Sequence, residues 1–128
     1  MSLYGCPEGE ARLTGGYNLP AKYIIHTVGP VWVPGEDSHQ QAIITLANCY
    51  LSCLNLADLQ GLKSIAFPCI STGAYCFPKD LAAKIAIESI NEWANNYYSV
   101  NQSGFYLKNI YIVCFSKKDL SYYGNIIK

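Results

Sequence analysis

Residues 67–78 read FPCISTGAYCFP and link a short apolar run to the start of a helix. The run itself, residues 64–67, carries no charge, which is typical of a strand covered on both faces. Residues 71–73 bring hydroxyls, amides and backbone freedom to the turn, and Pro78 suits a first helical turn. In an open α/β sheet such a turn lies at the carboxyl end of a strand, where anions bind. The stretch predicts either a phosphate site or a plain strand-to-helix turn.

Strand and helix patterns alternate along the rest of the chain. Residues 23–30 are rich in β-branched side chains and end at a Gly-Pro pair, which predicts a buried strand. Apolar residues recur at the spacing of a helical face from 43 to 57 and again from 82 to 93. The alternation predicts parallel strands joined by right-handed crossovers in a layered α/β domain. The expected strands are residues 10–17, 23–30, 63–70 and 109–115. Three helices are expected: the first ends near residue 59, the second runs from 78 to about 96, and the third covers 118–123.

The composition fits a single domain that covers residues 1–128. Hydrophobic residues make up 51% of the chain, enough for one core. Nine basic and nine acidic residues cancel, so the chain lacks the positive charge that binds a nucleic-acid polymer. Polar residues interrupt the apolar runs before the roughly 20 residues that a membrane-spanning helix needs, and the N-terminus lacks the form of a signal peptide. We expect a cytoplasmic or nuclear protein with no nucleic-acid or membrane partner.

Six cysteines raise the questions of disulfides and of a metal site. Most of them lie within apolar strand or helix patterns, which favours reduced thiols in a reducing compartment. Cys49 and Cys53 are one helical turn apart, yet no histidine or second cysteine pair completes a zinc-like spacing. We therefore expect no metal and no cofactor. The six are Cys6, Cys49, Cys53, Cys69, Cys76 and Cys114.

Three segments together, residues 5–14, 19–30 and 67–78, resemble the macro domain family in their order and spacing. The similar branch contains mono-ADP-ribosyl hydrolases and O-acetyl-ADP-ribose deacetylases, and the likeness runs from about residue 5 to 123. The resemblance implies an α/β fold of three layers, in which a mixed, mostly parallel sheet lies between helices. It also implies that this chain is truncated at its N-terminus relative to the family.

The resemblance assigns the loop after the middle strand to the diphosphate of ADP-ribose, which the family wraps with backbone amides. An aromatic residue at the Tyr75 position lies near the distal ribose in the family, and one at Phe115 flanks the adenine. The alternative for Phe115 is a core strand aromatic. The family usually has glycine at Cys76, so a positive φ there would now carry a Cβ. The expected ligand-binding residues are Ser71, Thr72, Gly73, Ala74, Tyr75, Cys76, Phe77 and Phe115.

The front of the family pattern is missing from this chain. The absent part carries two strands, a helix, an adenine-reading acid and the aspartate implicated in hydrolysis, so we expect no catalytic residue here. One missing strand lies in the family between the strands that correspond to 23–28 and 63–67, and its loss leaves unpaired backbone groups. We expect that the two strands close up or that another chain supplies a strand, giving a homo-oligomer through the incomplete sheet.

Several other side chains have a functional and a structural interpretation. His26 is expected to be a satisfied core histidine rather than a general base, and His39 a solvated surface residue. Cys76 at a helix start is a candidate nucleophile, but no base is identifiable nearby, so we interpret it as a substitution in the binding loop. Asp80 is expected to complement the helix dipole. The tyrosine pairs at 97–98 and 122–123 are expected to be exposed, either as scattered surface residues, which is the default, or as patches for self-association.

Three hypotheses of function stay open. The first is a domain that binds ADP-ribose or an ADP-ribosyl derivative, with little or no hydrolase activity. The second is an active mono-ADP-ribosyl or O-acetyl-ADP-ribose hydrolase, which would need a substitute for the absent aspartate. The third is a degenerate, non-binding domain that serves in an assembly.

Overall fold

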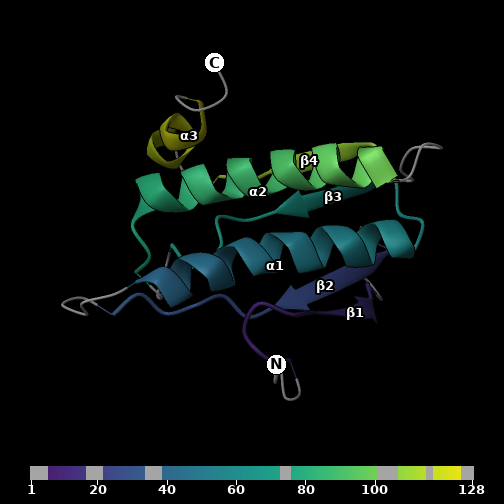
Figure 1. Ribbon diagram of the computed structural model, residues 1–128, viewed down its shortest axis with the longest axis horizontal. Coiled ribbons are helices and arrows are strands. Elements are labelled where there is room, and N and C mark those ends of the chain that lie inside the picture. Colours follow the sequence, from purple (N-terminus) through teal and green to yellow (C-terminus); the bar gives the residue numbers. More distant parts are fainter. Residues whose placement is uncertain are drawn as a thin grey trace.

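The computed structural model describes residues 6–16, 22–33, 39–72, 76–100, 107–114 and 117–124. Helices and strands alternate after an initial pair of strands, as the sequence pattern predicts (Figure 1). The elements are β1 (Ala11–Gly15), β2 (Tyr23–Thr27), α1 (Gln40–Leu59), β3 (Ser64–Phe67), α2 (Lys79–Val100), β4 (Asn109–Ile112) and α3 (Lys117–Gly124).

The described strands form two separate two-stranded sheets. β1 pairs with β2 antiparallel, from Ala11 opposite Thr27 to Gly15 opposite Tyr23. β3 pairs with β4 in parallel, with Phe67 opposite Ile112. β2 and β3 point the same way in Figure 1 but are not hydrogen-bonded to each other. The expectation that these two strands close up is therefore wrong, and their facing edges stay unpaired within the described part of the chain.

α1 and α2 lie side by side over one face of the strands (Figure 1). Their contact includes a hydrogen bond of 2.7 Å from the Trp93 indole N–H to Asn55 Oδ1. The core forms between these helices and the strands because both helices carry an apolar stripe toward the sheet. Its buried members include Leu46, Tyr50, Leu54, Ala57, Phe67, Phe77, Ala82, Ala83, Ala86 and Trp93.

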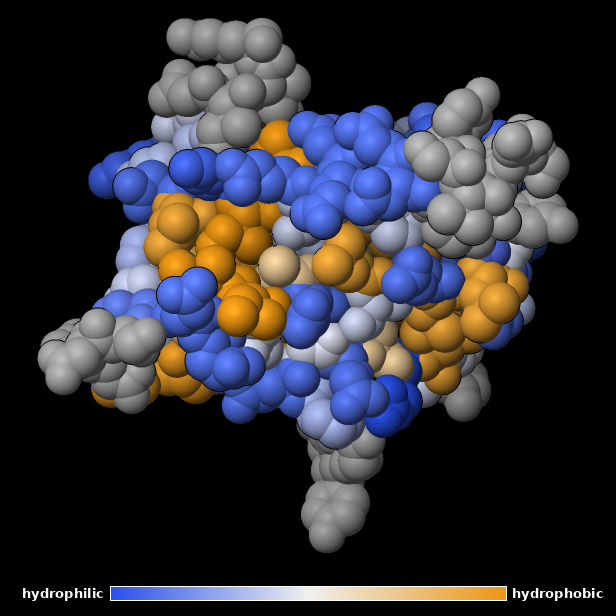
Figure 2. Space-filling model, viewed as in Figure 1, coloured by the Kyte–Doolittle hydropathy of each residue, from blue (hydrophilic) through white to orange (hydrophobic). Residues whose placement is uncertain are grey.

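The outer face of α2 is hydrophilic, as its sequence pattern predicts. Lys84 and Glu88 are exposed and pair at 4.0 Å across one helical turn. Figure 2 shows this face as a continuous blue band that crosses the upper part of the molecule.

α1 is more apolar than α2, and by length and composition alone it could cross a membrane. One face of this helix, which includes Leu46, Tyr50 and Leu54, is buried in the core, whereas Ile44 and Leu59 are exposed. A core-facing apolar stripe is the ordinary reason for such a helix in a globular domain.

The β3–β4 sheet is covered on one face only, within the residues that the structure describes. Phe67 is buried and Ile112 half-buried, whereas Tyr111 is 55% exposed and Val113 63% exposed. This alternation follows from the period of two along a strand. The prediction that β3 is covered on both faces is thus wrong. Its run of uncharged residues is too short to show which face of the strand meets solvent.

One buried carboxylate fixes the entry to β4. Asp58, near the end of α1, is 3% exposed, and its Oδ1 accepts a hydrogen bond of 3.0 Å from the amide of Leu107. Leu107 is itself buried, so this bond satisfies a donor that would otherwise lie in the core without water. The carboxylate therefore ties the end of α1 to the strand that follows α2.

Several element ends differ from the sequence prediction. α2 continues to Val100, past the expected end near residue 96, and β4 stops at Ile112. The N-cap residue of α1 is His39, which makes no side-chain capping bond. Tyr123 is only 5% exposed, so the expected exposure of the pair at 122–123 is wrong for this residue. It is buried where α3 packs against α2, a contact that no local pattern specifies. The side chains at 97–98 lie outside the described part of the chain.

Candidate functional site

Loop 71–77 is closed by hydrogen bonds of its own backbone. The amide of Phe77 donates to the carbonyl oxygen of Ser71 at 2.9 Å. Just before the loop, the carbonyl oxygen of Cys69 accepts from the hydroxyl of Thr72 at 2.9 Å and from its amide at 3.5 Å. Cys69 is therefore the anchor of the turn that leaves β3, and the Ser71–Phe77 bond holds the two ends of the loop together.

Two residues at the ends of this loop have left-handed backbone. Ser71 has φ of 65° and Cys76 has φ of 61°. Non-glycine residues adopt this region at a cost of about 1–2 kcal/mol, so the surrounding bonds must hold them there. The prediction that the position of Cys76 requires a positive φ is confirmed. Cys76 thus has a backbone conformation that suits glycine, and this conformation is strained because Cys76 carries a Cβ.

Four of the eight predicted ligand-binding residues lie in the described part of the chain: Ser71, Thr72, Cys76 and Phe77. Gly73, Ala74, Tyr75 and Phe115 lie outside the described residues.

Phe77 serves the scaffold of the loop. Its side chain is 1% exposed, and its ring centroid lies 4.8 Å from that of Trp32. Because its amide already donates to Ser71, that amide is not available to an anion in this conformation. The assignment of Phe77 to ligand contact stays a prediction, and its structural role is to hold the end of the loop in the core.

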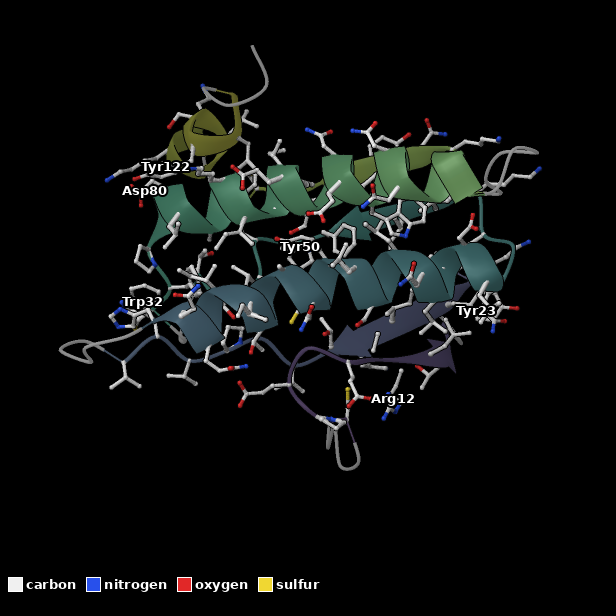
Figure 3. The ribbon with its side chains drawn as sticks, in the orientation of Figure 1. Arg12, Tyr23, Trp32, Tyr50, Asp80 and Tyr122 are labelled. Carbon is white, nitrogen blue, oxygen red and sulfur yellow. The ribbon has the colours of Figure 1, made fainter. Side chains whose placement is uncertain are left out.

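α2 begins directly after the loop. The amide of Ala82 donates to the carbonyl oxygen of Pro78 at 2.9 Å, which starts the helix. Asp80 lies in the first turn, as predicted, where a carboxylate interacts favourably with the helix dipole. Figure 3 shows Asp80 and Trp32 at the same end of the molecule, the end to which β2 and β3 point.

His39 stacks on Trp32 and is half-buried. Their ring centroids are 3.6 Å apart and their planes differ by 13°. The Nε2 atom of His39 also lies 3.0 Å from the carbonyl oxygen of Val33. The expectation of a solvated His39 thus holds only in part, because Trp32 covers one face of its ring. Trp32 in turn contacts Phe77, so this stack supports the loop.

His26 is satisfied within the β1–β2 sheet. Its Nε2 atom lies 2.9 Å from the hydroxyl oxygen of Thr14 on the neighbouring strand. The residue is only half-buried. The hydrogen bond agrees with the expectation of a satisfied histidine, whereas the expectation that His26 lies in the core is wrong.

An inter-sheet cavity of about 760 Å³ separates β2 from β3. It closes where Gly29 lies against Ser71, after the carboxyl ends of the two strands. Loop 71–77 thus contributes Ser71 to its wall. The lining contains no carboxylate among the described residues. It is made by residues of β2 and β3 and their neighbours: Tyr23, Ile24, Ile25, His26, Thr27, Gly29, Cys53, Leu62, Ser64, Ile65, Ala66, Phe67, Pro68, Cys69, Ile70, Ser71 and Tyr111.

Three buried hydroxyls have no well-formed hydrogen bond among the described residues: those of Tyr50, Ser71 and Tyr123. The hydroxyls of Tyr50 and Tyr123 lie near each other, and the backbone of Ile70 is close to Tyr50. Burial raises the pKa of both tyrosines above the usual value. Figure 3 shows Tyr50 projecting from α1 toward α2 and β3. The spacing of apolar residues in α1 predicts that Tyr50 lies in the core, whereas no local pattern predicts that Tyr123 is buried.

All six cysteines lie within the described residues, and none is in a disulfide. Cys49 and Cys53 are buried on the inner face of α1, and burial raises the pKa of the Cys53 thiol to about 12. No group of three or more His, Cys, Asp or Glu side chains in the described ranges could hold a metal ion. The half-buried Cys69 and Cys114 differ from the α1 pair, since their sulfur atoms lie 3.9 Å apart.

Comparison with known proteins gives consistent results. The chain matches the family model described as Macro domain over residues 2–86. It is 48% identical over 116 residues to a macro domain-containing protein of Methanosarcina mazei, covering 91% of this chain and 57% of that protein. It is 41% identical to the O-acetyl-ADP-ribose deacetylase of Escherichia fergusonii, covering 95% of this chain and 63% of that protein.

Solved structures agree with these matches. The Trypanosoma brucei macrodomain in complex with ADP-ribose superposes with a TM-score of 0.79 at 35% identity, over 97% of this chain and 47% of that chain. The present chain thus spans less than two thirds of the length of each of these relatives.

Proposed function

Since this chain belongs to the macro domain family, we propose that it binds ADP-ribose, alone or attached to a larger molecule. The predicted α/β fold of the family is confirmed by the superposition on a solved macrodomain. Among the related proteins, one solved structure contains ADP-ribose and one relative is an O-acetyl-ADP-ribose deacetylase. Binding by this chain is the function that its own loop supports best.

The observation that carries the proposal is the closed conformation of loop 71–77. The Ser71–Phe77 hydrogen bond joins the two ends of the loop, and Ser71 and Cys76 at these ends have left-handed backbone. α2 begins directly after the loop, and the N-terminus of a helix carries partial positive charge. This charge stabilises the negative charge of a diphosphate.

We assign little or no hydrolysis to this chain acting by itself. No carboxylate lines the inter-sheet cavity among the described residues, so the cavity offers no acid to position a water. The competing hypothesis is an active hydrolase, which the relationship to an O-acetyl-ADP-ribose deacetylase favours. The lining of the cavity is the reason to prefer the binding domain.

Titration calorimetry with ADP-ribose tests the binding proposal. The expected result is saturable heat at micromolar ligand, with weaker binding of AMP, which lacks the diphosphate bridge. A Gly73→Val variant should lose this binding because a branched side chain would fill the bend. Gly15→Val is the matched control, since a Cβ at Gly15 meets no atom within 4 Å. Absence of heat with the wild-type chain would instead support the degenerate, non-binding hypothesis.

Hydrolysis is tested with a mono-ADP-ribosylated peptide. The proposal expects the peptide to bind with its modification intact, and mass spectrometry should detect no ADP-ribose release beyond the rate without protein. Release that scales with protein concentration and disappears in the Gly73→Val variant would show that the chain is a hydrolase.

The unpaired edges of β2 and β3 favour a role for a second copy in completing the sheet. Both edges face the inter-sheet cavity, and unpaired strand edges are templates for strand addition. We keep the prediction of a homo-oligomer formed through this gap. Sedimentation equilibrium over a wide range of protein concentration should show a dimer, and a monomer at every concentration would contradict it.

A further inference from the structure

Cys69 and Cys114 occupy equivalent places on two neighbouring strands. β3 and β4 are parallel, with Phe67 opposite Ile112, and the amide of Val113 donates to the carbonyl oxygen of Phe67 at 2.8 Å. The pairing therefore continues beyond the last residues of the strands. When the register is extended, Cys69 comes to lie opposite Cys114, and their sulfur atoms are 3.9 Å apart.

The backbone spacing at this position suits a disulfide. Neighbouring strands lie about 4.8 Å apart, and disulfides join Cα atoms separated by roughly 4.4–6.8 Å. Bond formation would shorten the distance between the sulfur atoms to about 2.05 Å, a movement within reach of side-chain rotation and a small shift of the strand ends. Both residues are half-buried, so a small oxidant can reach them without unfolding of the core.

The pair also lies at the base of the predicted ligand loop. The carbonyl oxygen of Cys69 holds the turn that leads into loop 71–77, through the amide and the hydroxyl of Thr72. The hydroxyl of Tyr123, which belongs to α3, interacts with the thiol of Cys69. A change in the position of Cys69 is therefore transmitted to the start of the loop, where Ser71 already has a strained backbone.

We propose that Cys69 and Cys114 form a reversible disulfide under oxidation by a peroxide, and that this disulfide weakens the binding of ADP-ribose at loop 71–77. One thiolate attacks the peroxide, giving a sulfenic acid and water, and the second thiol attacks the sulfenic sulfur and releases a second water. The two sulfurs together lose two electrons and two protons, and the peroxide is reduced. A dithiol reverses the reaction by thiol–disulfide exchange. The effect on binding rests on the proposed function, whereas the disulfide does not.

The first measurement follows the covalent bond. After treatment with hydrogen peroxide, the intact mass of the wild-type chain should fall by about 2 Da and two thiols should become unreactive. Tryptic digestion should yield residues 64–79 linked to residues 109–117. Because residues 64–79 also contain Cys76, the assignment needs variants. The link should disappear in Cys69→Ser and in Cys114→Ser and should persist in Cys76→Ser. A link that survives in Cys69→Ser, or no link in the wild type, overturns the proposed pair.

The second measurement follows ADP-ribose affinity by calorimetry. Oxidation of the wild type should raise the Kd at least about fivefold, the lower end of ordinary coupling between sites, and dithiothreitol should restore it. The Kd of Cys114→Ser should not respond to peroxide. An unchanged Kd in a fully cross-linked sample overturns the effect on binding. If the reduced chain does not bind ADP-ribose at all, the proposed function fails and the control of binding fails with it, while the mass measurement still decides the disulfide.

Discussion

Gly29 lies against Ser71 so closely that no Cβ fits between them. A Cβ on Gly29 would overlap the hydroxyl of Ser71 and would stand 2.9 Å from Cγ2 of Ile70. Gly29 follows β2, and Ser71 follows β3. The two sheets, which are separated by a cavity along their facing edges, therefore meet at their carboxyl ends through this contact. The contact also positions the first residue of loop 71–77.

A Gly29→Ala substitution should destabilise the protein. The added methyl group would push Ser71 and Ile70 away, and such overpacking costs about 1–3 kcal/mol. Urea denaturation monitored by circular dichroism measures the loss of unfolding free energy. Gly15→Ala is the matched control, since a Cβ there meets nothing within 4 Å, and its stability should change little. Equal stability of Gly29→Ala and the wild type would contradict the close contact.

A Cys76→Gly substitution should stabilise the loop. The φ of 61° at this residue costs a non-glycine side chain strain that glycine avoids. After allowance for the greater freedom of glycine in the unfolded chain, the expected gain is about 0.5–1 kcal/mol. The same variant should bind ADP-ribose at least as tightly as the wild type.

The Cys76→Ala variant distinguishes the effect of the backbone conformation on stability from the effect of the thiol. It removes the sulfur but keeps the strained Cβ, so its stability should remain close to that of the wild type. Both variants are compared by urea denaturation and by calorimetry. A gain in Cys76→Ala equal to that in Cys76→Gly would show that the thiol, and not the backbone conformation, is unfavourable.

Removal of the Asp58 carboxylate should weaken the junction between α1 and β4. Asp58→Ala leaves the buried amide of Leu107 without its acceptor, and an unsatisfied buried donor costs about 1–3 kcal/mol. Asp58→Asn keeps an oxygen at the same place and should lose less. The exposed Glu92→Ala serves as the control, with a change within about 0.5 kcal/mol. A loss in Glu92→Ala as large as in Asp58→Ala would show that the buried bond is not the cause.

The unfolding free energy should fall above pH 9. A thiol with the ordinary pKa of 9.0 ionises in the unfolded chain first, whereas burial holds the pKa of Cys53 at about 12 in the folded protein. Between these values the unfolded state has lost a proton that the folded state retains. One such group lowers stability by about 1.4 kcal/mol per pH unit. Below pH 9 both states keep the proton, and the contribution is fully present.

Urea denaturation at pH 8, 9.5 and 10.5 checks this dependence. Cys53→Ala should show a shallower decline with pH than the wild type, although Tyr50 and Cys49, whose pKa values are also raised by burial, still contribute. Leu54→Ala is a matched core truncation that removes no titrating group, and its decline should keep the wild-type slope. The same slope in Cys53→Ala as in Leu54→Ala would rule out the Cys53 thiol as a source.

Local patterns were sufficient for the alternation of elements and for the left-handed position of Cys76. Periods of two and of three to four residues are properties of the single segment, and the likeness of residues 67–78 to a known loop includes its backbone conformation. Contacts between distant segments could not be foreseen in this way. Tyr123 is buried because other elements cover it, and Tyr50 of α1 interacts with its hydroxyl.

The separation of β2 from β3 is the clearest case of this limit. Each strand is apolar and β-branched, which predicts that it forms a strand but not which edge it pairs with. The place of Cys69 opposite Cys114 depends on the pairing of β3 with β4, which are distant in the sequence. The contact of Gly29 with Ser71 arises only when the two sheets pack into one core. The helices and strands thus follow from short-range chemistry, and the predicted ligand loop follows from a family resemblance. The cavity, the thiol pair and the contact of Gly29 with Ser71 depend instead on packing between segments that are distant in the sequence.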